Sequence, residues 1–293
     1  LLCGNGDCPH MAGLEYTLAG PTLRAADYTL VALTGGAAEP KVNGKRVNMF
    51  EPILLAPGDT LEIGMLISGL RGYLAVFGGF DIHPVLGSRS TDLKCHIGGL
   101  NGRALKAGDV LPVLRAFELP QERFKPLYRR VKAAALEDWA LATLTPHGFI
   151  GAQKFPLLRV VLGPQEDSFT ELGLFDFKSA LYTVTQDSNR MAAKLSGAAV
   201  EAKAGVDILS DGIVEGSVQI SANGQPIVML ADHQSTGGYA KIATVIPCDV
   251  PALAQVRPGQ SVGFRVVTVE EGAAACKKEK DKWAYLKEAI DHD

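Results

Sequence analysis

Short apolar runs separated by turn-forming residues dominate the chain and predict a mainly β protein. Strands are predicted at residues 14–18, 28–33, 60–63, 71–77, 157–162, 182–185 and 227–231. Runs of this length bounded by Gly, Pro, Asn or Asp are typical of β-strands. The dipeptides Asn43-Gly44 and Asn223-Gly224 predict tight turns between strands, because Asn and Gly both tolerate positive φ.

Helical patterns are confined to three places. Residues 131–144 are rich in Ala and Leu and predict a helix within a proline-flanked connection at 116–156. A helix start is predicted near Glu166. The tail at 270–293 predicts an amphipathic helix. Its apolar side is expected to carry Trp283, Leu286 and Ile290.

The two halves of the chain match weakly and predict two similar β-rich domains, at residues 1–115 and 157–269. Three pairs of segments match in the same order: Gly20-Pro21 with Gly163-Pro164, 73–77 with 227–231, and 106–110 with 257–262. Many short strands with few helices favour barrels or sandwiches as the architecture of each domain.

The most informative polar stretch lies between two apolar runs, at residues 232–241. It contains Asp232, His233, Gln234, Ser235, Thr236, Gly237, Gly238, Tyr239 and Lys241. Two glycines allow a tight turn and the close approach of a ligand to backbone N–H groups. The stretch is either a ligand-binding loop at the end of a sheet or an ordinary turn between strands.

A second polar segment, Ser88 to Asp92, follows the matching strand in the first half. The repeat alignment predicts that both loops face one cleft. Arg89, Arg190 and Lys241 would be its cations and suit a carboxylate substrate, while Asp232 and His233 would transfer protons.

Structural alternatives stand beside each of these roles. Arg89 can tie down its own loop, His233 can be structural, Lys241 can be solvated and Arg190 can cap a strand end. Gln219, between Val218 and Ile220, is expected to face inward and to be hydrogen-bonded.

Composition excludes several functional classes. The chain has 293 residues, 47% of them hydrophobic, and a net charge of −3, which gives no electrostatic case for nucleic acid or an anionic membrane. No apolar run is long enough to predict a transmembrane helix. The first residue is not Met, so a preceding N-terminal segment is expected.

The cysteines and the missing motifs narrow the chemistry further. Five scattered cysteines predict reduced thiols in a cytoplasmic protein. Cys3, Cys8 and His10 match no common zinc spacing, so no metal is expected. The chain has no phosphate-binding Gly-x-x-x-x-Gly-Lys motif, no dinucleotide fingerprint, no serine-hydrolase elbow and no Met-Lys-Met biotin attachment signature. ATP or a carried carboxyl group would therefore come from another chain.

Several motifs carry a family resemblance, which spans residues 1–268. The motifs are Arg71–Val76 with Gly78-Gly79, Leu86–Thr91, Gly163-Pro164-Gln165, Ser188–Met191 and Asp232–Tyr239. In this order they resemble the allophanate hydrolase subunit 2 family, also called the biotin-dependent carboxyltransferase or KipA-like family.

The resemblance implies a mainly β fold of two cyclophilin-like β-barrel domains with a few short helices. Members include the C-type component of bacterial 5-oxoprolinase, which opens 5-oxoproline to glutamate with ATP and with A-type and B-type partner subunits. The chain is expected to act in such a complex on a small amide or lactam, with ATP bound by a partner. Related domains form the carboxyltransferase part of urea carboxylase, which uses biotin, and other members bind a kinase-inhibitor-like B-type partner without catalysis.

The resemblance and the residue patterns together give one set of candidate site residues. The catalytic candidates are Asp232, His233 and Lys241; the substrate-binding candidates are Ser88, Arg89, Ser90, Thr91, Arg190, Gln219, Gln234, Thr236, Gly237, Gly238 and Tyr239.

Overall fold

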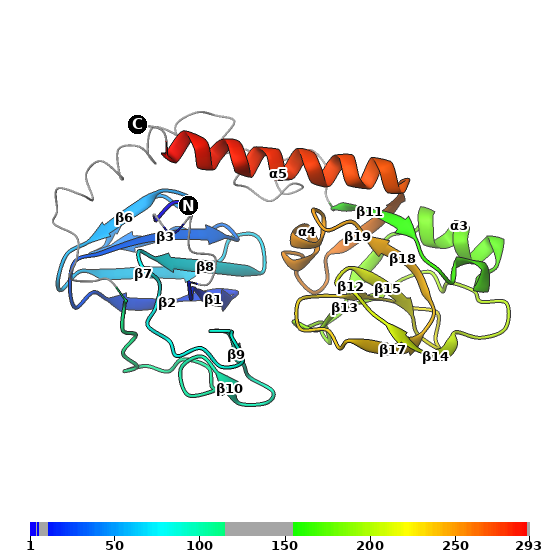
Figure 1. Cartoon of the computed structure of the whole chain (residues 1–293), viewed down its shortest axis with the longest axis horizontal. Coiled ribbons are helices and arrows are strands. Elements are labelled where there is room, and N and C mark those ends of the chain that lie inside the picture. The colour runs from blue at the N-terminus through cyan, green and yellow to red at the C-terminus, as the bar shows by residue number, and fades with distance from the viewer. Residues whose placement is uncertain (4, 6–10, 115–154, 292–293) are drawn as a thin grey trace. The chain divides into compact units, whose positions relative to one another are not determined.

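The computed structural model describes residues 1–3, 5, 11–114 and 155–291, and it is mainly β (Figure 1). Contacts between Cα atoms divide the chain into two compact units. Unit 1 comprises Leu1–Leu144 with Ala284–Asp293, and unit 2 comprises Thr145–Trp283. The helix predicted at 131–144 lies outside the described residues, as does almost all of the connection at 116–156.

Unit 1 is built from antiparallel strands in separate sheets. The strands are β1 Leu14–Thr17, β2 Ala19–Arg24, β3 Thr29–Gly35, β4 Lys41–Val42, β5 Lys45–Arg46, β6 Pro52–Leu55, β7 Thr60–Met65, β8 Arg71–Val76, β9 Thr91–Asp92 and β10 Ile97–Gly98. Two four-stranded sheets have the orders β1-β8-β3-β6 and β2-β7-β4-β5, and β9 pairs with β10. The described residues of unit 1 thus form these three sheets, and the second closed barrel that the family resemblance implies is not shown among them.

The core of unit 1 follows from alternation along its strands. In β1, Leu14 and Tyr16 are buried while Glu15 and Thr17 are not, because successive side chains point to opposite faces of a sheet. The predicted turn at Asn43-Gly44 is confirmed. It joins β4 to β5 with φ of 50° at Asn43 and 75° at Gly44.

Unit 2 contains a closed seven-stranded barrel in the order β11-β18-β15-β16-β13-β12-β19. Its strands, with the additional pair β14–β17, are β11 Leu157–Leu162, β12 Tyr182–Val184, β13 Ala192–Ser196, β14 Asp207–Gly212, β15 Ser217–Ile220, β16 Pro226–Met229, β17 Thr236–Tyr239, β18 Lys241–Val245 and β19 Ser261–Val266. Parallel pairing of β11 with β19 closes the barrel. Phe177 and Phe264 stack in its core with ring centroids 4.5 Å apart.

Among the first helical segments of unit 2, one helix has a side-chain cap. The predicted start at Glu166 is a 3-10 turn, Glu166–Ser168, and helix α3 begins later, at Glu171–Ser179. Its N-cap is Thr170, whose hydroxyl accepts from the N–H of Gly173. A short helix, α4, spans Val250–Ala254.

The predicted tail helix is confirmed as α5, Val269–Asp291. Thr268 and Glu271 form a capping box, in which the Glu271 N–H donates to Thr268 Oγ1 at 3.1 Å and the Thr268 N–H donates to Glu271 Oε2 at 2.9 Å. Among the described residues, no helix combines the length and the apolar content needed to cross a membrane.

Strand pairing supports the predicted internal repeat. The order β1-β8-β3-β6 in unit 1 has the same antiparallel pairing and chain order as β11-β18-β15-β16 in unit 2. The pair β2–β7 likewise corresponds to β14–β17. The two units therefore share a six-strand pattern.

The structure corrects two of the three sequence matches. Strand β8 corresponds to β18, so the match of 73–77 with 227–231 is wrong, because residues 227–231 contain most of β16. Gly20 and Pro21 lie inside β2, whereas Gly163 and Pro164 follow β11. The third match is borne out by two similar turns, in which Gly108 and Gly259 have φ of 89° and 87°.

Candidate functional site

The polar stretch at 232–241 is not one continuous loop. Residues 232–235 form a loop after β16, Thr236–Tyr239 form β17, and Lys241 begins β18. Strand β17 pairs with β14, so that Thr236 lies opposite Gly212 and Gly237 opposite Asp211. The pairing brings β14, which the sequence did not mark as part of a site, next to the predicted residues.

Lys241 is buried and forms the central ion pair of this region. Its Nζ lies 2.5 Å from Asp211 Oδ2 and donates to the carbonyl oxygen of Gly212 at 2.8 Å. The side chain of Lys241 is 9% exposed, whereas that of Asp211 is 53% exposed. The hydrogen bond from Lys241 is the main cause that lowers the pKa of Asp211, followed by the N–H of Gly212 and the charge of Lys241.

The ammonium group of Lys241 has more hydrogen-bond donors than it has acceptors among the described residues. An ammonium group has three N–H donors. The described residues accept two of them, one at Asp211 and one at Gly212. The third donor of this buried cation has no acceptor among the described residues.

Two glutamines support the strands around Lys241. Gln219 is buried and donates from Nε2 to the carbonyl oxygen of Tyr239 at 2.9 Å, so its predicted inward, hydrogen-bonded placement is confirmed. Gln165 Oε1 accepts from the backbone N–H of Lys241 at 3.0 Å. These bonds fix the backbone of the segment that carries Tyr239 and Lys241.

The two adjacent glycines of β17 differ in what surrounds them. A Cβ at Gly237 would lie 2.4 Å from Ile213 Cδ1 and 2.8 Å from Gln219 Nε2. A Cβ at Gly238 would meet nothing closer than 3.7 Å, the distance to the carbonyl oxygen of Ile208. A methyl group at 237 would therefore displace the ends of the Ile213 and Gln219 side chains, whereas one at 238 would have space.

A second ion pair joins the ends of β13 and β16. Arg190 Nε lies 2.8 Å from Asp232 Oδ2, and Arg190 Nη2 donates to Asp232 Oδ1 at 3.2 Å. The backbone N–H of Asp232 also donates to the carbonyl oxygen of Arg190 at 3.0 Å. Both carboxylate oxygens of Asp232 accept hydrogen bonds from Arg190. This pair, hereafter the clamp, holds the two ends of β13 and β16 and the loop after β16 together.

His233 follows the clamp and is half-buried. Its Nδ1 lies 2.6 Å from the carbonyl oxygen of Gln234. A carbonyl oxygen only accepts, so this contact places the proton of the neutral imidazole on Nδ1 and leaves the lone pair on Nε2. In this tautomer, His233 has the form of a general base.

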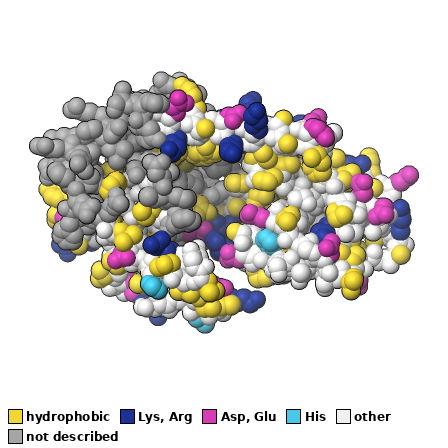
Figure 2. All heavy atoms as spheres, viewed as in Figure 1, with side chains coloured by type: hydrophobic (Ala, Val, Ile, Leu, Met, Phe, Trp, Pro, Cys, Tyr) yellow, Lys and Arg dark blue, Asp and Glu magenta, His cyan; other side chains and the backbone are white. Residues whose placement is uncertain are grey.

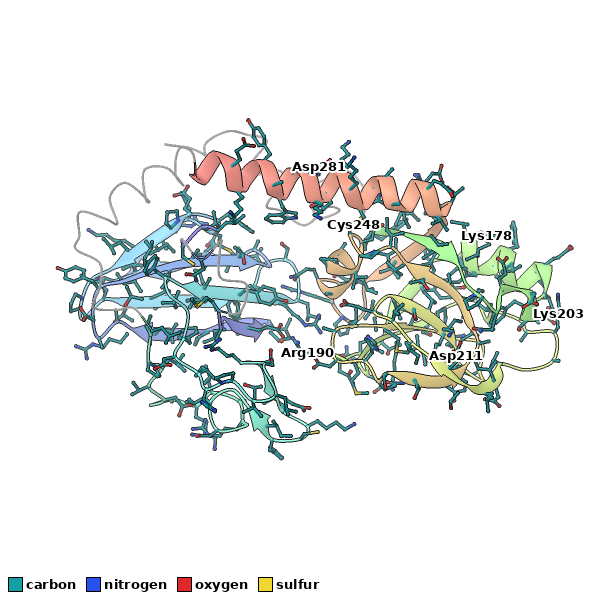
Figure 3. The ribbon with its side chains drawn as sticks, viewed as in Figure 1. Lys178, Arg190, Lys203, Asp211, Cys248 and Asp281 are labelled. Carbon is teal, nitrogen blue, oxygen red and sulfur yellow. The ribbon has the colours of Figure 1, made fainter. Side chains whose placement is uncertain are left out.

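The unit 2 candidates thus gather at two places. Figure 3 shows Arg190 and Asp211 at separate positions within unit 2. The first place is the β14–β17 pair with the start of β18, and it contains Asp211, Gln219, Thr236, Gly237, Gly238, Tyr239 and Lys241. The second place is the loop after β16 with its ion pair, and it contains Arg190, Asp232, His233 and Gln234.

The unit 1 candidates form a separate polar segment. Arg89 donates from Nε to the carbonyl oxygen of Ile82 at 2.9 Å, and the N–H of Ser90 donates to Ser88 Oγ at 3.1 Å. Thr91 begins β9. The segment follows β8, whereas the 232–241 stretch lies between β16 and β18. The two segments do not follow equivalent strands. The repeat alignment therefore no longer supports the prediction that both segments face one cleft.

Sequence reasoning missed Asp211 and left Gln165 out of the site. Asp211 lies in a strand with an exposed and irregular pattern, paired across a bulge, and no periodicity marked it. Gln165 was part of a motif, Gly163-Pro164-Gln165, and that motif was the available signal. A buried lysine requires a partner, but the sequence does not say which acid supplies it.

Two further features concern the charged side chains of the surface and the potential metal ligands. Lys and Arg side chains are scattered among acidic ones on the visible face (Figure 2). Among the described residues, no group of three or more His, Cys, Asp or Glu side chains is arranged to hold a metal ion.

Unit 2 is thus a mainly β domain with a closed barrel. Its candidate polar site contains a buried lysine that is paired with an aspartate. The chain belongs to the carboxyltransferase domain family, subdomains A and B, which matches residues 1–266. The predicted family is confirmed.

Two curated relatives are similar over nearly the whole chain. The C-type subunit of 5-oxoprolinase from Escherichia coli is 33% identical over 288 residues, which cover 98% of this chain and 84% of that protein. The C-type subunit of 5-oxoprolinase from Haemophilus influenzae is 31% identical over 294 residues, covering 99% and 86%. These homologues are enzyme subunits, and their name implies a complex of several subunits.

A solved structure extends the likeness to a larger enzyme. The urea carboxylase of Kluyveromyces lactis has a TM-score of 0.80 and 27% identity, with 94% of this chain covered. This chain spans 24% of the length of that protein. The fold is therefore shared between a separate subunit and a domain of a longer polypeptide.

Proposed function

We propose that the chain is the C-type subunit of an ATP-dependent 5-oxoprolinase, which opens 5-oxoproline to glutamate together with A-type and B-type subunits. The observation that carries this proposal is the 33% identity to the C-type subunit of the Escherichia coli enzyme over 98% of the chain. The polar site of unit 2 supplies groups suited to a small anionic lactam.

Lys241 is the group assigned to the substrate oxygen. It is buried, held by Asp211 and Gly212, and retains one donor beyond them. A fixed positive donor in a buried site stabilises developing negative charge on oxygen more strongly than the same group in water. The N–H groups at Gly237 and Gly238 are the backbone candidates for the same role.

Proton transfer is assigned to His233, which lies in the second of the two places, so a bound substrate would have to reach both Lys241 and the loop at 232–235. Its Nε2 is the basic nitrogen of the neutral ring, and the pair Arg190–Asp232 holds the preceding residues in place. ATP supplies the phosphoryl group that activates the lactam oxygen, and the absence of a phosphate-binding loop motif in this sequence favours a partner subunit as its binding site. His233 would then accept a proton from the water that adds to the activated carbonyl carbon and pass it to the ring nitrogen as the C–N bond breaks. A second water would release phosphate from the resulting acyl phosphate and leave glutamate.

Reconstitution tests this proposal. The full chain is mixed with purified A-type and B-type subunits, and glutamate release from 5-oxoproline is measured with and without ATP. ATP-dependent release that requires this chain supports the proposal. No release from a complex whose subunits are folded and associated contradicts it.

A second function has its own support, since the fold matches urea carboxylase with a TM-score of 0.80. In this alternative the chain transfers a carboxyl group from biotin, held on a carrier chain, to a urea-like amide. Transfer of labelled bicarbonate carbon to urea, in the presence of a biotin carboxylase and its carrier, distinguishes the two. Tight binding of a B-type subunit with neither activity would instead favour a non-enzymatic binding protein.

A further inference from the structure

Two of the scattered cysteines meet in unit 2. Cys248 follows β18, and Cys276 lies in the second turn of α5; the two sulfur atoms are 3.3 Å apart although the residues are 28 positions apart in the chain. Figure 3 shows Cys248 beside α5. Both side chains are partly exposed, so small molecules in solution can reach this pair.

The helix is packed against the barrel at the same point. A Cβ at Gly272 would lie 3.0 Å from Ile246 Cγ2, so α5 approaches the end of β18 closely at this position. Gly272 and Cys276 are four residues apart and therefore share one face of the helix. The sulfur contact thus lies on the face of α5 that packs against the barrel.

Charged neighbours hold Cys248 in position. Arg159, on β11, donates from Nη2 to Cys248 Sγ at 3.6 Å and forms a two-point ion pair with Asp249, with contacts of 2.6 and 2.9 Å. Burial, followed by the hydrogen bond that Cys248 shares with Cys276, raises the pKa of Cys248 to about 12. A raised pKa disfavours the thiolate of Cys248, so the proposed exchange begins at Cys276.

From this geometry we propose that Cys248 and Cys276 are a dithiol–disulfide site, which a low-molecular-weight disulfide such as glutathione disulfide oxidises and which fastens α5 to the barrel. The inference is independent of the proposed function. A disulfide needs its sulfur atoms about 2.05 Å apart, so oxidation would have to draw the two atoms together from their present separation of 3.3 Å.

The exchange takes two balanced steps. Cys276 loses its proton and attacks one sulfur of glutathione disulfide, which breaks that S–S bond and releases one glutathione thiolate. Cys248 gives its proton to the released thiolate and attacks Cys276 Sγ, which releases the second glutathione. Two protein thiols are oxidised to one disulfide, and one glutathione disulfide is reduced to two thiols.

Peptide mapping of the full chain tests the site, because trypsin separates the two cysteines. Cys248 falls in the peptide 242–265, since Arg257 precedes proline, and Cys276 falls in 266–277. After treatment with glutathione disulfide and alkylation of remaining thiols, we expect a cross-linked pair of these peptides, lighter by two hydrogen atoms than their sum. Dithiothreitol should abolish it.

Matched variants make the result specific. Cys95, which is exposed, lies in the separate peptide 95–103, and Cys95→Ser should leave the cross-link intact. Cys276→Ser should remove the cross-link and restore alkylation of Cys248. Oxidised wild type should also melt several degrees above reduced wild type, a difference that Cys276→Ser should lack, because the bridge restricts the unfolded chain.

Two outcomes would overturn the proposal. One is separate glutathione adducts on the two peptides, without a cross-link. The other is free thiols at both positions under conditions that modify Cys95 fully.

Discussion

Lys241 and Asp211 form an asymmetric ion pair: their charged atoms are 2.5 Å apart, yet the lysine side chain is 9% exposed and the aspartate side chain 53%. A buried charge is costly unless it is paired and hydrogen-bonded. Asp211 supplies the pairing from the solvent side, and Gly212 supplies a second acceptor. The lysine is thereby held charged inside the protein with a donor to spare, which is the property that a binding or catalytic cation needs.

The first prediction concerns Lys241 itself. Lys241→Met keeps most of the side-chain volume and removes the charge, so the barrel should fold while turnover in the reconstituted complex falls on the order of 10²- to 10³-fold. Circular dichroism and glutamate release measure the two effects. Lys178→Met and Lys203→Met, at exposed positions of the same unit, should leave turnover unchanged (Figure 3). A folded Lys241→Met variant with wild-type turnover would remove this residue from the mechanism.

Acid stability is the second prediction. The lysine lowers the folded-state pKa of Asp211 below its ordinary value of 3.8, so ionised Asp211 favours the folded state. Its contribution to stability is present above the ordinary pKa and is lost as the pH falls through the lowered one. The difference in melting temperature between wild type and Asp211→Asn should therefore shrink between about pH 5 and about pH 2. A constant difference across this range would argue against the ionic role of Asp211.

The glycine pair in β17 provides a third prediction with an internal control. Gly237→Ala should destabilise the protein by about 1–3 kcal/mol, because the new methyl group meets Ile213 and Gln219. Gly238→Ala has space and should change the free energy of unfolding by less than about 0.5 kcal/mol. Turnover of Gly238→Ala should nevertheless fall at least about tenfold if a ligand approaches its backbone. Normal turnover would show that this approach does not occur.

The fourth prediction is that variants of His233 and of its neighbour Asp232 lose activity to different extents. His233→Gln removes the basic nitrogen and should reduce kcat by roughly 10²- to 10⁴-fold. Asp232→Asn retains one acceptor oxygen for Arg190, so it should keep most of the activity. Steady-state kinetics of the reconstituted complex decides between the two roles. Equal losses in both variants would instead make Asp232 part of the chemistry.

The fifth prediction addresses the core of unit 1. Tyr16 is buried, burial raises its pKa to about 12, and its hydroxyl has no hydrogen-bond partner among the described residues. Tyr16→Phe should therefore be neutral or stabilising by up to about 1 kcal/mol. Tyr182→Phe, which loses a 3.4 Å bond to the carbonyl oxygen of Asp176, should destabilise by about 0.5 kcal/mol. Denaturant unfolding measures both, and a clear loss of stability in Tyr16→Phe would reveal a bond formed outside the described residues.

Strand positions were largely predictable because the residues of each strand and of its flanking turns indicate where it begins and ends. The run 157–162 is β11 without adjustment, and Asn43-Gly44 forms the turn that its residue types favour. The tail helix was also predictable, and its capping box is visible as Thr268 followed three residues later by Glu271. Local sequence was less informative at β17, because Thr236–Tyr239 has the composition of a turn and is a strand only through its pairing with β14.

The internal repeat was predicted from the sequence, but the strands were aligned wrongly. Both halves share a six-strand order, but β8 matches β18, and each of these strands begins with a buried cation, Arg71 or Lys241. Arg71 has Glu15 at 3.9 Å, much farther than the acid paired with Lys241. Short sequence matches had joined β8 to the segment of β16, because apolar strands resemble one another regardless of their place in a sheet.

The sequence alone determined the family, the mainly β character and most strand positions, and it offered a set of candidate polar residues for a site. Only the tertiary structure decided which partners those residues have: Asp211 for Lys241, Arg190 for Asp232, and Cys276 for Cys248. The physical reason is that strand positions depend on neighbours in the chain. Ion pairs and sulfur contacts depend instead on register and barrel closure, which join residues 28 to 42 positions apart.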